Sequence, residues 1–196
     1  PSKPSKEQII NQAFKFHSEG NISEASKYYK DIIDQGYEDH RVFANYGVIL
    51  KGLENPIGAE LLQRKAIKLN PNFTEAYSNL GDILRDLGKL KEAEFFVRKA
   101  IKLNPKFANA YSNLGNILYD LGRSEEAAIS TRQAIEINPE FALAHFNLAT
   151  ILKVLGQLEK AKLSLRKAIK INPNFAEAHS ILGSILKDLG KTEEGN

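Results

Sequence analysis

The residues with the clearest capacity for binding chemistry are asparagines that recur at one position every 34 residues. They are Asn11, Asn45, Asn79, Asn113 and Asn147. A carboxamide offers two hydrogen-bond donors and an acceptor, so it can satisfy both the N–H and the C=O of a passing peptide backbone. The column therefore predicts a surface that holds an extended peptide whatever its sequence. The structural alternative is that these side chains bond to neighbouring repeats, as many side chains bond to backbone.

Side chains near this column differ between repeats, as selectivity for a ligand would require. The predicted peptide-binding set therefore also contains Asp82, Asn116, Tyr119, Phe146 and Lys153. Phe146 stands where Ser78, Ser112 and Ser180 recur in other repeats. A lone aromatic among serines predicts an anchor for a ligand side chain, and the alternative is that Phe146 folds onto its neighbours.

Signals for catalysis or cofactor binding are absent from the sequence. The chain has no Cys, which excludes disulfides, thiolate zinc sites and cysteine nucleophiles. It has no glycine-rich phosphate loop and no dinucleotide-binding fingerprint. His145 and His179 are one repeat apart and lack a third ligand, so packing is favoured over a metal site. We expect no enzyme activity, no metal and no cofactor.

Composition favours a folded protein with a buried core and argues against several classes of partner. The chain has 196 residues, a formal charge of +3 and 42% hydrophobic residues, which is enough to build a core. No apolar run approaches the ~18 residues that a membrane helix needs, and no signal peptide opens the chain. We expect a cytoplasmic protein, because the absence of Cys fits a reducing compartment. We expect no membrane partner, and no nucleic-acid partner because a charge of +3 is small for this length.

A second column is basic and consists of Lys30, Arg64, Arg98, Arg132 and Arg166. Glutamates four residues before Arg64 and Arg98 are spaced for helical ion pairs. The column is interpreted as a solvated helix face, with a nucleic-acid or acidic-membrane surface as the weaker alternative.

The elements that carry both columns follow from the same period. Asn-Pro recurs at residues 70, 104, 138 and 172, followed two residues later by Phe. Between these points apolar residues are spaced at three and four residues, which predicts two helices separated by a turn at a glycine such as Gly88. Pro ends the second helix, and we expect the Asn before it to adopt the left-handed conformation. Small residues such as Gly47 and Gly115 are expected to let the paired helices approach closely.

This pattern resembles the tetratricopeptide repeat (TPR), in its bacterial form. The motif positions of the third repeat are occupied by Tyr77, Leu80, Gly81, Leu84, Ala93, Val97, Ala100 and Pro105. The resemblance implies an all-α fold, an α-solenoid built as a right-handed superhelix, whose first helices line a concave surface that binds peptides or helices. The asparagine column is similar to the ladder in the TPR superhelix of O-linked N-acetylglucosamine transferase.

The period predicts a lead, five whole repeats and a partial sixth. The boundaries are 1–5 for a disordered lead, then 6–39, 40–73, 74–107, 108–141, 142–175, and 176–196 with a first helix only, ending at Gly190. Ser5 and Gln8 are spaced as a capping box for the first helix. The first two repeats diverge from the motif; for example, Glu54 replaces the turn glycine.

The sequence favours a protein-protein interaction scaffold that binds a peptide or partner segment in the concave groove. The alternative is a recognition or spacer arm of a larger bacterial transferase whose catalytic domain is absent from this chain. Self-association through an uncapped C-terminal end is a further expectation, because apolar residues of the last helix lack a covering helix.

Overall fold

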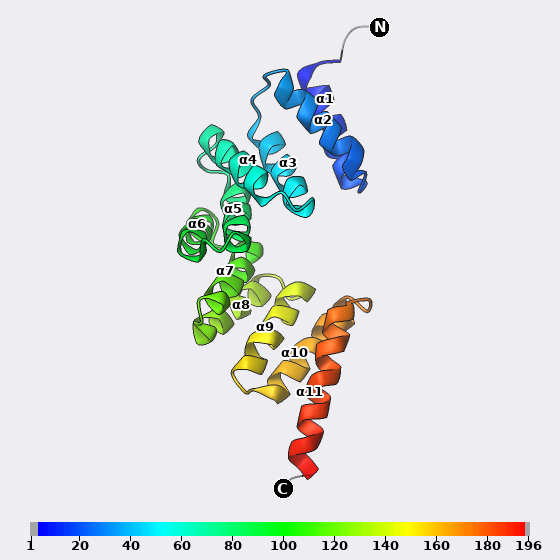
Figure 1. Ribbon diagram of the computed structural model, residues 1–196, viewed down its shortest axis with the longest axis vertical. Coiled ribbons are helices and arrows are strands. Elements are labelled where there is room, and N and C mark those ends of the chain that lie inside the picture. The colour runs from blue at the N-terminus through cyan, green and yellow to red at the C-terminus, as the bar shows by residue number, and fades with distance from the viewer. Residues whose placement is uncertain (1–3, 195–196) are drawn as a thin grey trace. The chain divides into compact units, whose positions relative to one another are not determined.

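The computed structural model describes residues 4–194, and side chains for residues 4–190. In that range the ordered elements are eleven helices joined by short turns (Figure 1). They are α1 (Lys6–Ser18), α2 (Ile22–Asp34), α3 (His40–Gly52), α4 (Pro56–Leu69), α5 (Thr74–Asp86), α6 (Leu90–Leu103), α7 (Ala108–Asp120), α8 (Ser124–Ile137), α9 (Ala142–Val154), α10 (Leu158–Ile171) and α11 (Ala176–Glu194). We call the odd-numbered helices first helices and the even-numbered ones second helices.

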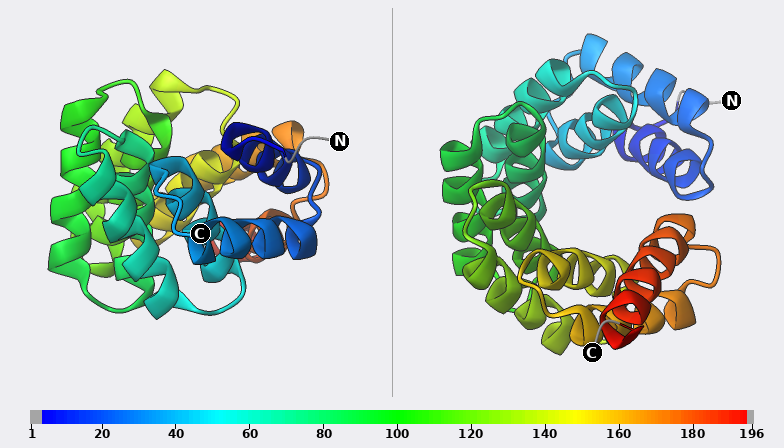
Figure 2. Two further views of the ribbon diagram at one scale, coloured as in Figure 1. Left: turned by 90° about the horizontal axis from the view of Figure 1, so that it is seen from above. Right: turned by 60° about the horizontal axis from the view of Figure 1, so that its bottom comes forward.

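The helices divide into two compact units, Pro1–Lys89 and Leu90–Asn196. Unit 1 contains α1 to α5 and unit 2 contains α6 to α11. Within each unit, helices that follow one another in the chain pack side by side, as the views in Figure 2 show. A single helical pair cannot bury its apolar side, so stacking of neighbouring pairs supplies each unit's core.

The turn inside each repeat depends on one residue in the left-handed conformation. In unit 2 that residue is Gly122, with φ 76°, and Gly156 adopts φ 71°. The backbone N–H groups of Gly122 and Arg123 donate to the carbonyls of Tyr119 and Leu118, both at 2.9 Å, and so satisfy the carbonyls that end α7. In unit 1, Glu54 adopts φ 57° at the same repeat position, so the turn is kept without its glycine.

The asparagines that end the second helices differ from expectation. Asn70 and Asn138 have φ of −136° and −132°, so they are extended and not left-handed. The cause is the proline that follows each of them, whose ring excludes the helical region for the preceding residue. The Oδ1 of Asn70 accepts a bond of 3.1 Å from the backbone N–H of Asn72, which stabilises the extended turn.

At the two ends of the chain, the ordered residues and the end of the last helix differ from expectation. Residues 1–3 of the predicted disordered lead lie outside the described residues, but Ser5 is ordered as the N-cap of α1. Its capping box with Gln8 is confirmed, with bonds of 2.7 and 3.2 Å. At the other end, α11 does not stop at Gly190 but continues to Glu194. Glycine permits a turn but does not require one. Inside a helix it is about 1 kcal/mol less favourable than alanine, which the helix can tolerate.

Close approach of paired helices is achieved by small residues, as predicted. A Cβ on Gly47 of α3 would lie 2.7 Å from the Gln63 side chain and 3.3 Å from the Ala59 carbonyl oxygen of α4. A Cβ on Gly115 of α7 would collide with the Thr131 hydroxyl of α8. The core of unit 1 includes the fully buried Tyr29, with partly buried aromatic residues packed against its cluster. In unit 2 the core consists mainly of alanine, leucine and isoleucine.

Candidate functional site

Each predicted asparagine lies on an accessible stripe of a first helix. Positions spaced by four, three and four residues share one face of a helix. We call this face on α3, α5, α7 and α9 the first-helix stripe. All of its members are half-buried or exposed. Its members are Arg41, Asn45, Val48 and Gly52; Glu75, Asn79, Asp82 and Asp86; Asn109, Asn113, Asn116 and Asp120; and Leu143, Asn147, Thr150 and Val154. Asn11 is exposed on α1.

Asn147 and Asn45 also join neighbouring helices. In unit 2, Nδ2 of Asn147 donates to Oγ of Ser112 at 3.3 Å, which links α9 to α7. In unit 1, Asn45 forms a side-chain hydrogen bond with Tyr29. The structural interpretation therefore holds in part for these two residues. A carboxamide has two donors and an acceptor, so one hydrogen bond leaves groups that can still bond to a ligand.

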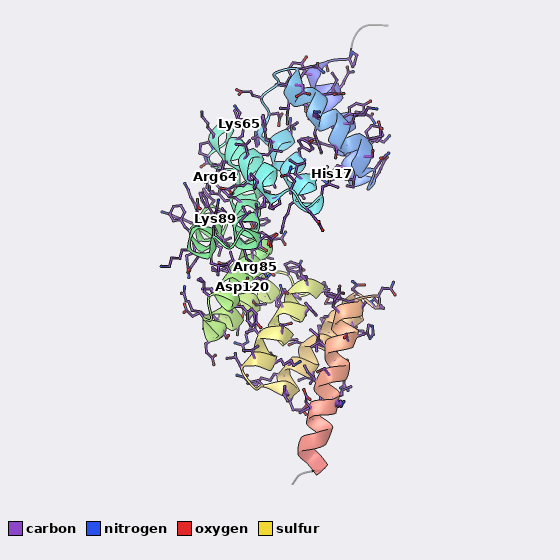
Figure 3. The ribbon with its side chains drawn as sticks, in the orientation of Figure 1. His17, Arg64, Lys65, Arg85, Lys89 and Asp120 are labelled. Atoms are coloured by element: carbon purple, nitrogen blue, oxygen red, sulfur yellow. The ribbon has the colours of Figure 1, made fainter. Side chains whose placement is uncertain are left out.

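Unit 1 contains a charged cluster that the sequence reasoning missed. Lys51 of α3 forms an ion pair with Asp82 of α5, and its Nζ lies 3.2 Å from Oδ2 of Asp86. Arg85, labelled in Figure 3, lies 3.9 Å from Asp82. Burial lowers the pKa of Lys51, but Asp82 and Asp86 outweigh that effect and raise it. Asp82 is thus already paired on the stripe, and a ligand cation would compete with Lys51 for it.

The predicted residues of unit 2 have different environments. Asn116 and Tyr119 of α7 are half-buried, and Nζ of Lys153 lies 3.4 Å from Oγ of Ser184. Phe146 is half-buried and its ring packs on Phe175 with centroids 4.8 Å apart, so the alternative that it folds onto a neighbour holds in part. Phe175 is the aromatic that follows the last Asn-Pro, so it fills the junction beside Phe146.

The serines at the position of Phe146 do not line the accessible face in the middle of the chain. Ser78 and Ser112 are 1% and 2% exposed. They lie one residue before an asparagine of the column, and this step turns them by about 100° around the helix towards the neighbouring helix.

His145 and His179 have a packing role that explains why they replace aromatics. Nε2 of His145 lies 2.9 Å from the carbonyl oxygen of Pro139, and His179 makes the same contact with Pro173. In unit 1 the hydroxyl of Tyr77 donates to the Pro71 carbonyl at 3.1 Å. Histidine and tyrosine therefore carry the same hydrogen bond to a proline six residues earlier. Among the described side chains, no three His, Cys, Asp or Glu residues are grouped to share a metal ion.

Two members of the basic column, Arg64 in unit 1 and Arg98 in unit 2, are paired with glutamates. Arg64 and Lys89, both labelled in Figure 3, contact Glu60 at 2.8 and 2.9 Å. Hydrogen bonds from Lys89 and Arg64 lower the pKa of Glu60. In unit 2, Arg98 contacts Glu94 at 2.7 Å, which confirms the predicted i, i+4 pairs.

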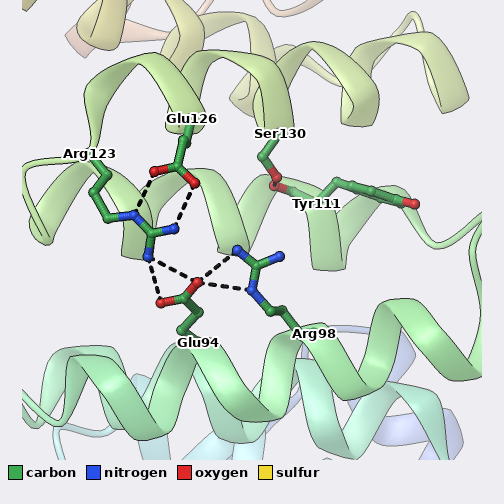
Figure 4. A network of polar contacts seen from close by, with 6 residues as sticks. All are labelled: Glu94, Arg98, Tyr111, Arg123, Glu126 and Ser130. Atoms are coloured by element: carbon green, nitrogen blue, oxygen red, sulfur yellow. Dashed lines mark hydrogen bonds and ion pairs between the residues drawn. The ribbon is translucent and has the colours of Figure 1, made fainter.

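In unit 2 these pairs extend into a network across two second helices. Arg123 bonds to Glu94 at 2.9 Å and to Glu126 at 2.6 Å (Figure 4). Next to it, the Ser130 hydroxyl donates to the Tyr111 carbonyl at 2.9 Å. The network joins α6 to α8, and its two arginines and two glutamates cancel in charge.

No helix in the described part of the chain is both long enough and apolar enough to cross a membrane.

Sequence comparisons identify the repeat. Family profiles described as "Tetratricopeptide repeat" match residues 108–141 and 142–175, and residues 62–95. A profile described as "TPR repeat" matches residues 81–122. No curated protein matches the chain.

Solved TPR structures share the fold at low sequence identity. TTC0263, a thermophilic TPR protein of Thermus thermophilus, is 17% identical with a TM-score of 0.79, covering 93% of this chain and 99% of that one. YrrB, described as a TPR protein with an unusual peptide-binding site, is 23% identical with a TM-score of 0.63, covering 90% and 91%. The Cut9–Hcn1 tetramer structure gives 20% identity and a TM-score of 0.83, covering 93% of this chain and 36% of that one.

These matches confirm the predicted fold class, an all-α solenoid of helix-turn-helix units. The TPR fold is consistent with an interaction scaffold, and TPR proteins are generally non-catalytic. The chain belongs to the tetratricopeptide repeat family.

Proposed function

We propose that this chain is a protein-interaction scaffold that binds a peptide or partner segment on its first-helix stripes. The observation that carries the proposal is the half-buried asparagine found in the middle of the stripes of α3, α5, α7 and α9. A repeated carboxamide at an accessible position suits the peptide backbone, which repeats its own donors and acceptors. The description of YrrB as a peptide-binding TPR protein supports the same use of the fold.

Different positions of the stripes contact the backbone of the ligand and its side chains. The asparagines supply contacts that do not depend on the ligand's sequence, each worth about 0.5–1.5 kcal/mol net. The remaining positions set the preference. In unit 1 they are charged, with Asp82 and Asp86 beside Lys51. In unit 2, α7 offers amides, whereas α9 offers the exposed Leu143 and Val154, 47% and 59% accessible.

The test is a selection of extended peptides against the whole chain, followed by affinity measurements on matched variants. Peptides of about 12 residues are displayed on phage, and the strongest binders are measured by fluorescence polarisation. Asn79→Ala in unit 1 and Asn113→Ala in unit 2, each made alone, are expected to weaken the peptides that the altered unit binds about fivefold, because one net hydrogen bond is lost.

The control makes the same change at asparagines outside the stripes. Asn72 and Asn174 are exposed in the loops after α4 and α10. Their replacement by alanine is expected to leave affinity unchanged. Circular dichroism checks that all variants are equally helical. Equal affinity of both single variants and the parent for every selected peptide would refute the proposal.

A further inference from the structure

Two clefts of the same construction lie between successive second helices of unit 2. The first, of about 450 Å³, lies between α6 and α8 over α7, with an apolar lining that includes Ile101, Leu114 and Ile129. The second, of about 410 Å³, lies between α8 and α10 over α9, lined by Ile135, Leu148 and Leu163. Each residue of the second set is 34 positions after its counterpart in the first. Both volumes lie within the range of about 300–1,000 Å³ typical of ligand pockets.

The side chains at the mouths of these clefts are large, apolar and exposed. Ile129 is 65% exposed and Leu163 is 61% exposed, and Phe95 at the same repeat position on α6 is 62% exposed. Single exposed apolar residues are ordinary, but a row at one repeat position, of which Ile129 and Leu163 also line clefts, is typical of an interaction surface. This row lies on second helices, so it is separate from the first-helix stripes.

Charge indicates the chemistry of the partner. The second helices of unit 2, α6, α8 and α10, contain ten lysines and arginines against six glutamates. The first helices α7 and α9 contain one acidic residue, Asp120, and one basic residue, Lys153. The first cleft is lined by Arg98 and Lys102 against Glu126, and the second by Arg132 and Lys167 against Glu136, so each has one more basic than acidic residue. Arg98 and Lys167 already contact Glu94 and Glu140, so an acidic partner would compete with these two glutamates. A partner that fills the clefts would therefore gain from negative charge beside its apolar residues.

We propose that the second-helix surface of unit 2, formed by α6, α8 and α10, binds an acidic amphipathic helix of a partner protein. The apolar side of that helix inserts side chains into the two clefts. Its acidic side chains contact the lysines and arginines that line them. Docking of an amphipathic helix into an apolar groove is a recurrent mode of recognition, and the first-helix stripes remain available to a second ligand.

The probe is a fluorescein-labelled synthetic helix of about 18 residues, long enough to form in isolation. It contains glutamate and alanine, with leucines at every third and fourth position as a continuous apolar side. We expect saturable binding to the whole chain that weakens as salt is raised, because part of the attraction is between exposed charges. Two control peptides have lysine in place of glutamate, or the same composition scrambled, and are expected to bind at least about tenfold more weakly.

Matched variants assign the binding to the clefts. Ile129→Gln with Leu163→Gln is expected to weaken the acidic peptide about tenfold or more, since both side chains line the clefts. Leu61→Gln is the control: Leu61 is 69% exposed at the same repeat position in unit 1, so the loss of exposed apolar surface is alike. Because all three residues are exposed, the variants are expected to fold like the parent.

Four outcomes would overturn the proposal. They are no saturable binding of the acidic peptide, equal binding of the lysine peptide, equal binding of the scrambled peptide, and an affinity that the double variant leaves unchanged. Vesicles containing phosphatidylglycerol are tested in parallel. Binding to these vesicles without binding to the acidic peptide would assign the surface to anionic lipid and would also overturn the proposal.

Discussion

Units 1 and 2 use the same repeat with different chemistry. Unit 1 buries an aromatic group around Tyr29, contains a non-glycine turn at Glu54 and has an ion-paired cluster on its first helices. Unit 2 has glycine turns, a core rich in alanine and leucine, and stripes of amides and apolar residues. The repeat therefore requires a geometry of turns and small contacts, while residue types on its accessible faces are free to vary with the ligand.

The largest expected difference between the units is at alkaline pH. Burial raises the pKa of Tyr29 to about 12, although a hydrogen bond from Asn45 opposes the shift. In the unfolded chain the phenol ionises near pH 10. The resulting stabilisation is complete below pH 10 and is lost as the pH rises towards 12, with a total on the order of 2–3 kcal/mol. Urea unfolding between pH 8 and 11.5 measures it.

Tyr29→Phe is the matched control for this effect. It removes the titrating hydroxyl and its contact with His17, at a cost of about 1 kcal/mol at neutral pH. The alkaline loss of stability is expected to be smaller in this variant than in the parent. An identical dependence on pH in both proteins would contradict the assignment to Tyr29.

A second prediction compares two glycines at one repeat position within unit 2. Gly115→Ala places a Cβ against the Thr131 hydroxyl, which donates to the Ala127 carbonyl at 2.9 Å, and is expected to destabilise the chain by about 2 kcal/mol. A Cβ on Gly183 would meet nothing within 4 Å, so Gly183→Ala is expected to stabilise by up to about 1 kcal/mol. Urea midpoints report both. If both changes altered stability equally, close packing of α7 on α8 would not be the cause of the destabilisation by Gly115→Ala.

A third prediction changes the left-handed turn residue in each unit. Glu54→Gly in unit 1 is expected to raise stability by about 1 kcal/mol, because glycine adopts positive φ without steric cost. Gly122→Ala in unit 2 is expected to lower stability by a similar amount. A Cβ at Gly122 would have nothing within 4 Å, so side-chain packing does not complicate the comparison there. Thermal unfolding measures both variants. A loss of stability in Glu54→Gly would contradict the claim that the positive φ of Glu54 is sterically unfavourable.

The smallest expected effect is at acidic pH in unit 1. Burial lowers the pKa of His17, so its neutral form is favoured in the folded chain. Stability from this residue is complete above the unfolded pKa of about 6.5 and is lost as the pH falls through the lower folded value. His17→Gln is expected to flatten the stability profile between pH 7 and 5. An unchanged profile would assign the acid dependence to other groups.

Much of the fold was predictable from the 34-residue period, but contacts between repeats were not. Helices, turns and close packing at Gly47 and Gly115 follow from local spacing. Comparison of equal repeat positions, however, misses contacts such as Lys51 with Asp82, which are 31 residues apart. Asn147 and Ser112 are 35 apart. Both contacts join unequal repeat positions, so a comparison at steps of 34 residues does not find them.

Other departures have equally local causes. The extended asparagines follow from the proline after each of them, and the spacing around Phe146 does not reveal the ring of Phe175 beside it. The row formed by Phe95, Ile129 and Leu163 could have been found in the sequence, because it has the same 34-residue spacing as the asparagines. Only the structure shows that this row is exposed and that Ile129 and Leu163 line clefts.

The most direct test of the proposed function is an NMR titration of the asparagine side-chain amides. A selected extended peptide is added to the ¹⁵N-labelled chain, and the carboxamide resonances are followed. The proposal predicts large shifts for Asn79 and Asn113, on the first-helix stripes, and none for Asn72 and Asn174 in the loops. A bound peptide that leaves Asn79 and Asn113 unshifted would contradict the assignment of the stripes as the binding surface.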